Sequence, residues 1–175
     1  QCVAADGTVV DGDELLYVIA NDRVRKGRPP EGVVGTLMSN LGLEQALADK
    51  GIELVRARVG DRYVLELMAE RGWSLGGEAS GHIICGDLTT TGDGIVAALQ
   101  VAAAMAAAGE SLLALKSALN KLPQTLINVS VPAGFVLEDC EAAVAESKRV
   151  EEVLSGRGRL VLRASGTEPL ISVMI

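Results

Sequence analysis

The sequence predicts an α/β fold: a three-layer-like domain with a mostly parallel mixed sheet and covering helices, then a small, incomplete α+β domain. Two patterns predict it. Up to Lys121, apolar runs of strand length alternate with stretches of helical periodicity, as in a parallel sheet covered by helices. After Pro123 the order becomes strand, helix, strand, strand, which is typical of a small α+β unit. Hydrophobic residues make up 49% of the 175 residues, enough to build cores for both domains.

Local start and stop signals predict the elements of the first domain. In order, we expect a hairpin within 1–10, a helix capped by Asp13 and stopped by Gly27, a strand over 33–38, and a helix opened by Ser39 or Asn40 and closed by Gly51. A strand over 52–59, a helix over 61–71 stopped by Gly72, and short strands over 73–75 and 82–85 follow. Asp93 and Ser111 then cap two further helices.

Two apolar segments carry an expectation about burial. The alanine-rich run 95–108 is too short to span a bilayer and predicts a buried helix. Residues 125–131 alternate between apolar and polar side chains, which predicts a half-buried strand. A helix over 139–154 and strands over 160–164 and 170–175 complete the second domain, and the final strand suggests that this domain is truncated.

Charge and cysteine usage exclude some classes of partner. The formal net charge of −7 argues against a nucleic acid or an anionic membrane, because both are bound by basic surfaces. A small anionic ligand is still compatible with this charge. Cys2, Cys85 and Cys140 lack metal-ligand spacing and are interpreted as reduced thiols. With no secretory signal at the start, we expect a cytoplasmic protein.

The first polar segment is the loop 77–82. Glu78 can accept hydrogen bonds from adjacent hydroxyls, Ser80 can donate or accept, and Gly81 allows close backbone approach. With the imidazole of His82, this set suits a sugar. We expect the loop to be exposed. The alternative is a polar turn in which His82 is hydrogen-bonded nearby.

The second polar segment is the loop 163–169. Arg163 offers a bidentate fork, the hydroxyls of Ser165 and Thr167 can donate, and Gly166 allows successive N–H groups to curl around an anion. This set suits a phosphate. The alternative is a plain hairpin turn with glycine at a positive φ.

Two further segments are weaker. In 58–62, Asp61 is interpreted as a helix N-cap, and Arg58 and Arg62 as surface charges that could support the site. The carboxylates of Asp11 and Asp13 could suggest a metal site. We interpret them as a capping turn, because no third ligand lies nearby and a helix starts at once. We therefore expect no metal ligands in this chain.

Five segments in the same order carry a family resemblance. They are Val34–Asn40, Arg58–Glu66, Gly77–His82, Thr89–Gly94 and Arg163–Pro169. Together they resemble the phosphoglucosamine mutase branch of the α-D-phosphohexomutase superfamily. The Glu-x-Ser-Gly-His and Arg-x-Ser-Gly-Thr-Glu-Pro patterns mark the superfamily, and the first two segments are more specific to the branch.

The resemblance implies an isomerase that interconverts glucosamine 6-phosphate and glucosamine 1-phosphate, on the route to UDP-N-acetylglucosamine and peptidoglycan precursors. It implies an active-site phosphoserine, a bisphosphorylated intermediate and Mg²⁺, with the serine and metal loops in two N-terminal domains that this sequence does not contain. Residues 1–10 then resemble the tail of domain two, 11–121 domain three and 124–175 part of domain four. We expect the chain alone to be inactive, to bind no metal, and to need those missing domains as partners.

The resemblance also assigns roles to residues. Glu78, Ser80, Gly81 and His82 would read the sugar, and His82 is a candidate for proton handling. Arg163, Ser165, Gly166 and Thr167 would bind the phosphate of a hexosamine phosphate or its bisphosphate. Many relatives have Lys in place of Arg58 and Arg in place of Ser172. Two alternatives remain: a phosphomannomutase or phosphoglucomutase, and a stand-alone, non-catalytic phosphosugar-binding module.

Overall fold

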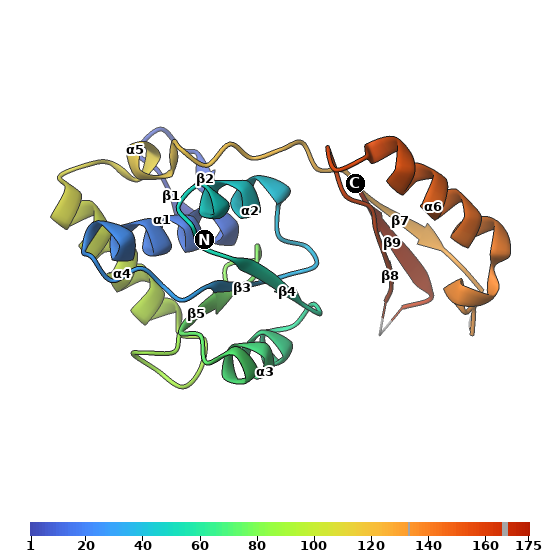
Figure 1. Cartoon of the computed structure of the whole chain (residues 1–175), viewed down its shortest axis with the longest axis horizontal. Helices are drawn as coiled ribbons and strands as arrows, with labels where there is room; N and C mark the ends of the chain where they lie inside the picture. Colours follow the sequence, from blue (N-terminus) through green and yellow to red (C-terminus); the bar gives the residue numbers. More distant parts are fainter. Residues whose placement is uncertain (133, 166–167) are drawn as a thin grey trace. The chain divides into compact units, whose positions relative to one another are not determined.

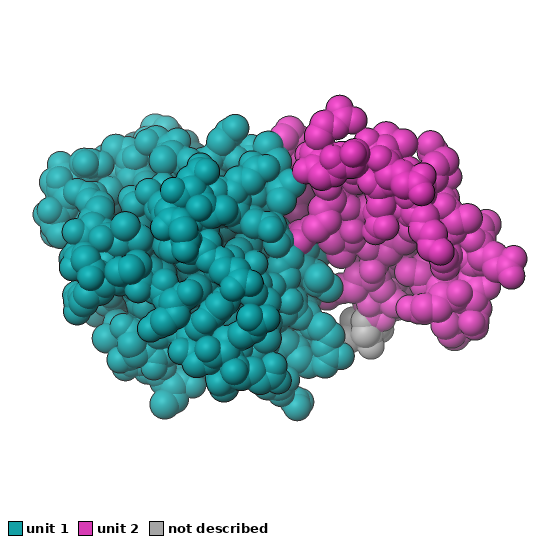
Figure 2. Space-filling model, viewed as in Figure 1, with its two compact units in different colours: residues 1–122 teal, residues 123–175 magenta. Residues whose placement is uncertain are grey.

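The computed structural model describes residues 1–132, 134–165 and 168–175. The chain divides into two compact units, Gln1–Leu122 (unit 1) and Pro123–Ile175 (unit 2). Figure 1 shows the elements of both units, and Figure 2 shows the residues that each unit comprises.

Unit 1 alternates strands and helices along most of its length. Its elements are β1 (Cys2–Val3), β2 (Val9–Val10), α1 (Gly12–Arg25), β3 (Val33–Thr36), α2 (Leu41–Ala48), β4 (Leu54–Ala57), α3 (Asp61–Arg71), β5 (Leu75–Gly77), β6 (Ile83–Cys85), α4 (Gly94–Ala108) and α5 (Leu112–Lys116). The predicted hairpin within 1–10 is confirmed, since β1 and β2 pair antiparallel. The predicted strand over 73–75 is displaced, because the N–H of Trp73 still bonds to Met68 O at the end of α3.

The main sheet of unit 1 has the strand order β4-β3-β5-β6. Strand β3 runs parallel to both β4 and β5, and β6 is antiparallel to β5. The expected mostly parallel mixed sheet is therefore confirmed. Helices cover both faces, as Figure 1 shows: α3 lies on the opposite side of the sheet from α1 and α2.

Two hydrophobic clusters form the core of unit 1, one on each face of the sheet. Consecutive residues of a strand point to opposite faces, and accordingly Val33 belongs to one cluster and Val34 to the other. The larger cluster packs against α1, α2, α4 and α5. The smaller one packs against α3 through Val64 and Met68.

Two predicted helix caps are wrong by one or two residues. Helix α1 is capped by Asp11, whose carboxylate accepts from Glu14 N while the Glu14 side chain accepts from Asp11 N, a complete capping box. Asp13 instead lies inside the helix and is 1% exposed. Helix α3 is capped by Gly60, and Asp61 is its first residue. A carboxylate close to a helix start is a weak guide to the exact cap, because adjacent residues offer the same chemistry.

The predicted buried helix over 95–108 is a partly exposed one. Ala97, Val101 and Ala104 of α4 are buried, whereas Ile95 is 75% and Leu99 60% exposed. The buried residues lie three and four positions apart, so a single stripe of the helix faces the core. None of the described helices is long and apolar enough to cross a membrane.

Unit 2 is a three-stranded antiparallel sheet with one long helix. Its elements are β7 (Leu126–Ser130), the 3₁₀ helix η1 (Leu137–Asp139), α6 (Glu141–Leu154), β8 (Val161–Ala164) and β9 (Leu170–Met174). The strand order is β7-β9-β8, which confirms the α+β character. The half-buried strand expected over 125–131 is wrong, since all five residues of β7 are exposed. Strand β7 forms an edge of the sheet, and alternation in its sequence could not show whether anything covers it.

Candidate functional site

The 77–82 loop joins the antiparallel strands β5 and β6. Backbone hydrogen bonds close it: Glu78 N donates to His82 O at 2.9 Å and Gly81 N to Glu78 O at 2.9 Å. Gly81 has a φ of +104°, which an L side chain adopts only with strain. Gly12 N at the start of α1 donates to Ala79 O at 2.9 Å. The loop is thus bound to α1 as well as to its own strands.

The carboxylate of Glu78 points into the protein. The residue is 9% exposed, so the expectation of an exposed loop is wrong at this position. Its Oε1 accepts from the backbone N–H of Gly60 at 3.0 Å, and its Oε2 lies 3.3 Å from His82 Nδ1. Ser80 is exposed, as is His82, whose side chain is 70% exposed. The loop therefore combines a held carboxylate with a hydroxyl and an imidazole open to solvent.

The loop before α3 is brought to Glu78 through Gly60, a residue that the sequence analysis did not single out. Gly60 has a φ of +129°. The arginines on either side are engaged elsewhere: the guanidinium of Arg58 lies 3.8 Å from the ring centroid of Tyr63, and Arg62 Nε donates to Glu66 at 2.8 Å. The structure therefore brings the 58–62 segment to the 77–82 loop. The contact is made by the backbone N–H of Gly60 and not by a charged side chain.

Gly12 is a second residue that the sequence analysis missed. A Cβ at this position would lie 1.9 Å from Glu78 O and 2.7 Å from Gly81 N. Any side chain would push the loop away from α1. A glycine directly after an N-cap aspartate is the available signal, because Gly is a weak helix former that needs a local reason.

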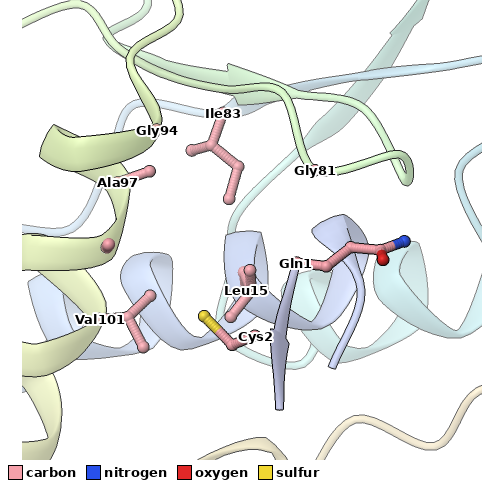
Figure 3. A pocket seen from close by; sticks show the side chains of 9 residues that line it. Gln1, Cys2, Leu15, Gly81, Ile83, Gly94, Ala97 and Val101 are labelled. Atoms are coloured by element: carbon pink, nitrogen blue, oxygen red, sulfur yellow. The ribbon is translucent and has the colours of Figure 1, made fainter. Parts of the chain in front are cut away.

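A small pocket borders the 77–82 loop at Gly81 (Figure 3). Leu15, Ile83, Ala97 and Val101 line it with apolar side chains, and Gln1 lies beside the Gly81 loop. A sugar needs several hydrogen-bonding groups, which this lining does not supply. The side of the loop that carries Glu78 and His82 is therefore the candidate site.

The second candidate segment, 163–169, belongs to unit 2; it begins with the last two residues of β8 and ends directly before β9. Arg163 pairs with Ser172 across these strands, and its Nε is buried without a hydrogen-bond partner among the described residues. Ser165 N donates to Leu170 O at 2.9 Å, and Ser165 Oγ accepts from Glu168 N at 3.2 Å. Gly166 and Thr167, two of the expected phosphate ligands, lie outside the described residues.

The carboxylates considered for a metal already have partners within the protein. Asp11 caps α1 and pairs with Lys121. Asp13 Oδ2 accepts from Asn40 N at 2.7 Å, and burial raises the pKa of Asp13 to about 6. No group of three or more His, Cys, Asp or Glu among the residues that the structure describes could hold a metal ion. These residues do not fit a Mg²⁺ site.

Both units of the chain match domains of one protein family. The profile for phosphoglucomutase/phosphomannomutase, alpha/beta/alpha domain III, matches residues 11–123. The chain belongs to this family. The profile for the C-terminal domain of the same family matches residues 126–175. Both candidate loops fall within the matched ranges.

Curated relatives share more than half of the sequence. A phosphoglucosamine mutase of Aeromonas hydrophila is 58% identical over 169 residues, and one of Pseudomonas fluorescens is 55% identical over the same length. In each case the match covers 97% of this chain and 38% of the relative. The chain thus spans well under half the length of these relatives.

Solved structures confirm the fold at lower identity. The Aspergillus fumigatus N-acetylphosphoglucosamine mutase in complex with GlcNAc-6P and magnesium has a TM-score of 0.72 and 20% identity, covering 97% of this chain and 44% of that one. A phosphoglucomutase/phosphomannomutase family protein from Burkholderia thailandensis has a TM-score of 0.70 and 20% identity, covering 98% and 38%. The α/β fold of this chain is therefore that of the phosphohexomutases.

Proposed function

We propose that the chain is the substrate-binding half of a phosphoglucosamine mutase, which interconverts glucosamine 6-phosphate and glucosamine 1-phosphate through a bisphosphorylated sugar. The observation that carries the proposal is the 58% identity to a phosphoglucosamine mutase along 97% of the chain. We assign the location of the intact enzyme to the cytoplasm, where the sugar phosphates of this route occur.

The residue types of the two loops support a division of labour between them. A substrate that binds in two orientations needs one group that holds the phosphate not taking part in the reaction and another that reads the ring hydroxyls. The 77–82 loop offers Glu78, Ser80 and His82 for the hydroxyls. The 163–169 loop offers Arg163 and Ser165 for the phosphate, with Gly166 and Thr167 as further expected ligands. Arg58 and Arg62 are at most supporting charges, since Arg58 stacks on Tyr63 and Arg62 donates to Glu66.

The phosphoryl transfer itself is assigned to parts of the enzyme outside this chain. A phosphoserine loop would donate the phosphoryl group, and Mg²⁺ would offset the charge that develops during transfer. The chain supplies substrate binding and orientation, which lower the entropic part of the barrier. We therefore expect the 175-residue chain alone to convert no sugar phosphate.

The test is an assay of the full-length parent enzyme with glucosamine 6-phosphate, mannose 6-phosphate and glucose 6-phosphate. The highest kcat/KM should be with the amino sugar. A preference for mannose 6-phosphate or glucose 6-phosphate would establish the alternative, a phosphomannomutase or phosphoglucomutase. Binding without turnover of any of the three would establish a non-catalytic phosphosugar-binding protein.

The role of Glu78 is tested by Glu78→Gln in the parent enzyme. The amide keeps the size of the side chain and loses its charge-assisted acceptance, which contributes about 1.5–3 kcal/mol, so kcat/KM should fall roughly 10- to 100-fold. Glu70→Gln, at an exposed residue of α3, is the matched control and should leave kcat/KM unchanged. An unchanged kcat/KM in Glu78→Gln would remove Glu78 from the site.

A further inference from the structure

The two carboxylate oxygens of Glu78 have different partners. Oε1 accepts from the backbone N–H of Gly60 at 3.0 Å, and Oε2 lies 3.3 Å from Nδ1 of His82. The side chain of Glu78 is 11% exposed, whereas that of His82 is 70% exposed. The imidazole thus has one edge held by a fixed carboxylate and the rest of the ring in solvent.

This contact determines where the proton of the neutral imidazole lies. An ionised carboxylate can only accept hydrogen bonds, so Nδ1 must carry the hydrogen. Nε2 then carries the lone pair and is an acceptor. A histidine side chain without such a partner favours the opposite tautomer in water, with its proton on Nε2. The carboxylate of Glu78 therefore reverses the intrinsic preference of His82.

The N–H of Gly60 keeps the carboxylate in this position. The nearby cations do not compete for it among the contacts of the described residues: Arg58 stacks on Tyr63, and Arg62 pairs with Glu66. A backbone donor cannot swing away as a lysine or arginine side chain can. Gly60 thus orients the carboxylate of Glu78, and that carboxylate in turn orients the ring of His82.

We propose that Gly60 and Glu78 form a relay that holds His82 in the Nδ1–H tautomer, so that Nε2 accepts a hydrogen bond from a hydroxyl of the bound sugar. Glu78 is then a positioning residue that acts through His82, in addition to any direct contact with the sugar. The identity of the ligand rests on the proposed function. The tautomer itself does not, and it can be measured in the chain without substrate.

His82 is the one histidine of the sequence, which makes the measurement free of overlap. Long-range ¹H–¹⁵N correlation spectra of the 175-residue chain, in alkaline buffer where an imidazole is neutral, report which nitrogen carries the proton. The expected result is a majority of the Nδ1–H form in the wild type and a majority of the Nε2–H form in Glu78→Gln. Glu70→Gln, at an exposed residue of α3, should match the wild type. A wild type with mainly the Nε2–H form, or a Glu78→Gln variant with the wild-type ratio, would overturn the relay.

Gly60 is tested against a matched glycine at the other end of α3. Gly60 and Gly72 both have positive φ, +129° and +67°, so alanine strains the backbone at either position. Neither site is crowded by backbone: the added Cβ meets the Tyr63 ring at 3.3 Å at position 60 and nothing within 4 Å at position 72. Gly60→Ala should move the tautomer ratio of His82 toward the Nε2–H form, and Gly72→Ala should not. Equal effects of both variants would reduce Gly60 to a structural role.

The parent enzyme separates failure of the relay from failure of the proposed function. Glu78→Gln and His82→Asn should each lower kcat/KM for glucosamine 6-phosphate, and the double variant should lose much less than the product of the two losses, because both remove one unit. Fully multiplicative losses would mean that the two residues act independently and would overturn the relay. If the tautomer is as proposed but both single variants keep full mutase activity, the relay stands and the assignment of this loop to the sugar fails.

Discussion

The 77–82 loop of unit 1 and the 163–169 loop of unit 2 are held in different ways. The first is bonded to segments distant in the sequence, through Gly12 and Gly60. At the second, Ser165 donates to Leu170 and accepts from Glu168, both within the same hairpin. The 77–82 loop is thus shaped by tertiary contacts, whereas the printed bonds of Ser165 in the 163–169 segment are local.

The cores of the two units differ in the same direction. Unit 1 has hydrophobic clusters on both faces of its sheet. In unit 2, the buried residues within the described part of the chain are Val161, Ile171 and Met174. Burial of apolar surface is the main source of stability, so unit 2 should be the less stable unit. If both loops bind ligand as proposed, the 77–82 loop is preorganised by the larger core, whereas ligand binding should stabilise unit 2.

The largest expected effect tests whether the units are stabilised separately. Leu16 in α1 is 0% exposed, so Leu16→Ala should lower the free energy of unfolding of unit 1 by about 2–5 kcal/mol. The measurement is urea unfolding followed by amide NMR signals of each unit. Signals of unit 1 should shift their midpoint and those of unit 2 should not. Val153→Ala, at a residue 58% exposed in α6, is the control. A common shift of both sets of signals would show that the two units unfold together and are not stabilised separately.

The second prediction concerns pH and unit 1. Burial raises the pKa of Asp13 to about 6 from 3.8, so the folded state keeps a proton that the unfolded state releases. The resulting stabilisation is complete below pH 3.8 and is lost as pH rises through about 6, a change of about 3 kcal/mol. Unfolding of the wild type and Asp13→Asn between these pH values should diverge by this amount. Asp49→Asn, at an exposed carboxylate, should follow the wild type, and an Asp13→Asn curve parallel to the wild type would contradict the burial argument.

The third prediction sharpens where unit 1 ends. The Asn40 side chain donates to Leu122 O at 2.9 Å and accepts from Leu122 N at 3.0 Å, as well as from Gly42 N at 2.9 Å. Asn40→Ala should lower the free energy of unfolding of unit 1 by about 1–3 kcal/mol and remove the hydrogen-exchange protection of the Leu122 amide. Asn40→Asp keeps the acceptor oxygen and should retain part of that protection. Equal exchange in all three proteins would show that Asn40 does not hold the last residue of unit 1.

The smallest expected effect lies in the 163–169 loop, the proposed phosphate site. Arg163→Lys replaces the guanidinium fork by a point charge, so binding of sulfate or glucosamine 6-phosphate to the chain should weaken roughly two- to ten-fold, up to about 1.4 kcal/mol. An NMR titration that follows the amides around residue 163 measures it. Arg149→Lys, at an exposed arginine paired with Glu146, should bind like the wild type. Shifts confined to other parts of the chain would leave 163–169 as a hairpin turn.

Local signals predicted many elements well and the geometry of the candidate site less well. The helix over 61–71 with its stop at Gly72, and the cap at Asp93, are confirmed because each depends on a few adjacent residues. The sequence also indicated Glu78 and His82 as polar residues of one loop. It did not indicate Gly60 or Gly12, because their importance comes from a hydrogen bond and a close approach to a loop distant in the sequence.

The α/β alternation, the turn glycines and the chemical identity of both loops were determined by the sequence alone, since periodicity and residue type act locally. Tertiary structure decided which faces are covered: α4 has one buried stripe, β7 is exposed, and the carboxylate of Glu78 is directed inward. Burial depends on what packs against a segment, and the same apolar or polar pattern is compatible with more than one neighbour. For that reason the roles of Gly60 and Glu78 behind His82 emerged only from the folded chain.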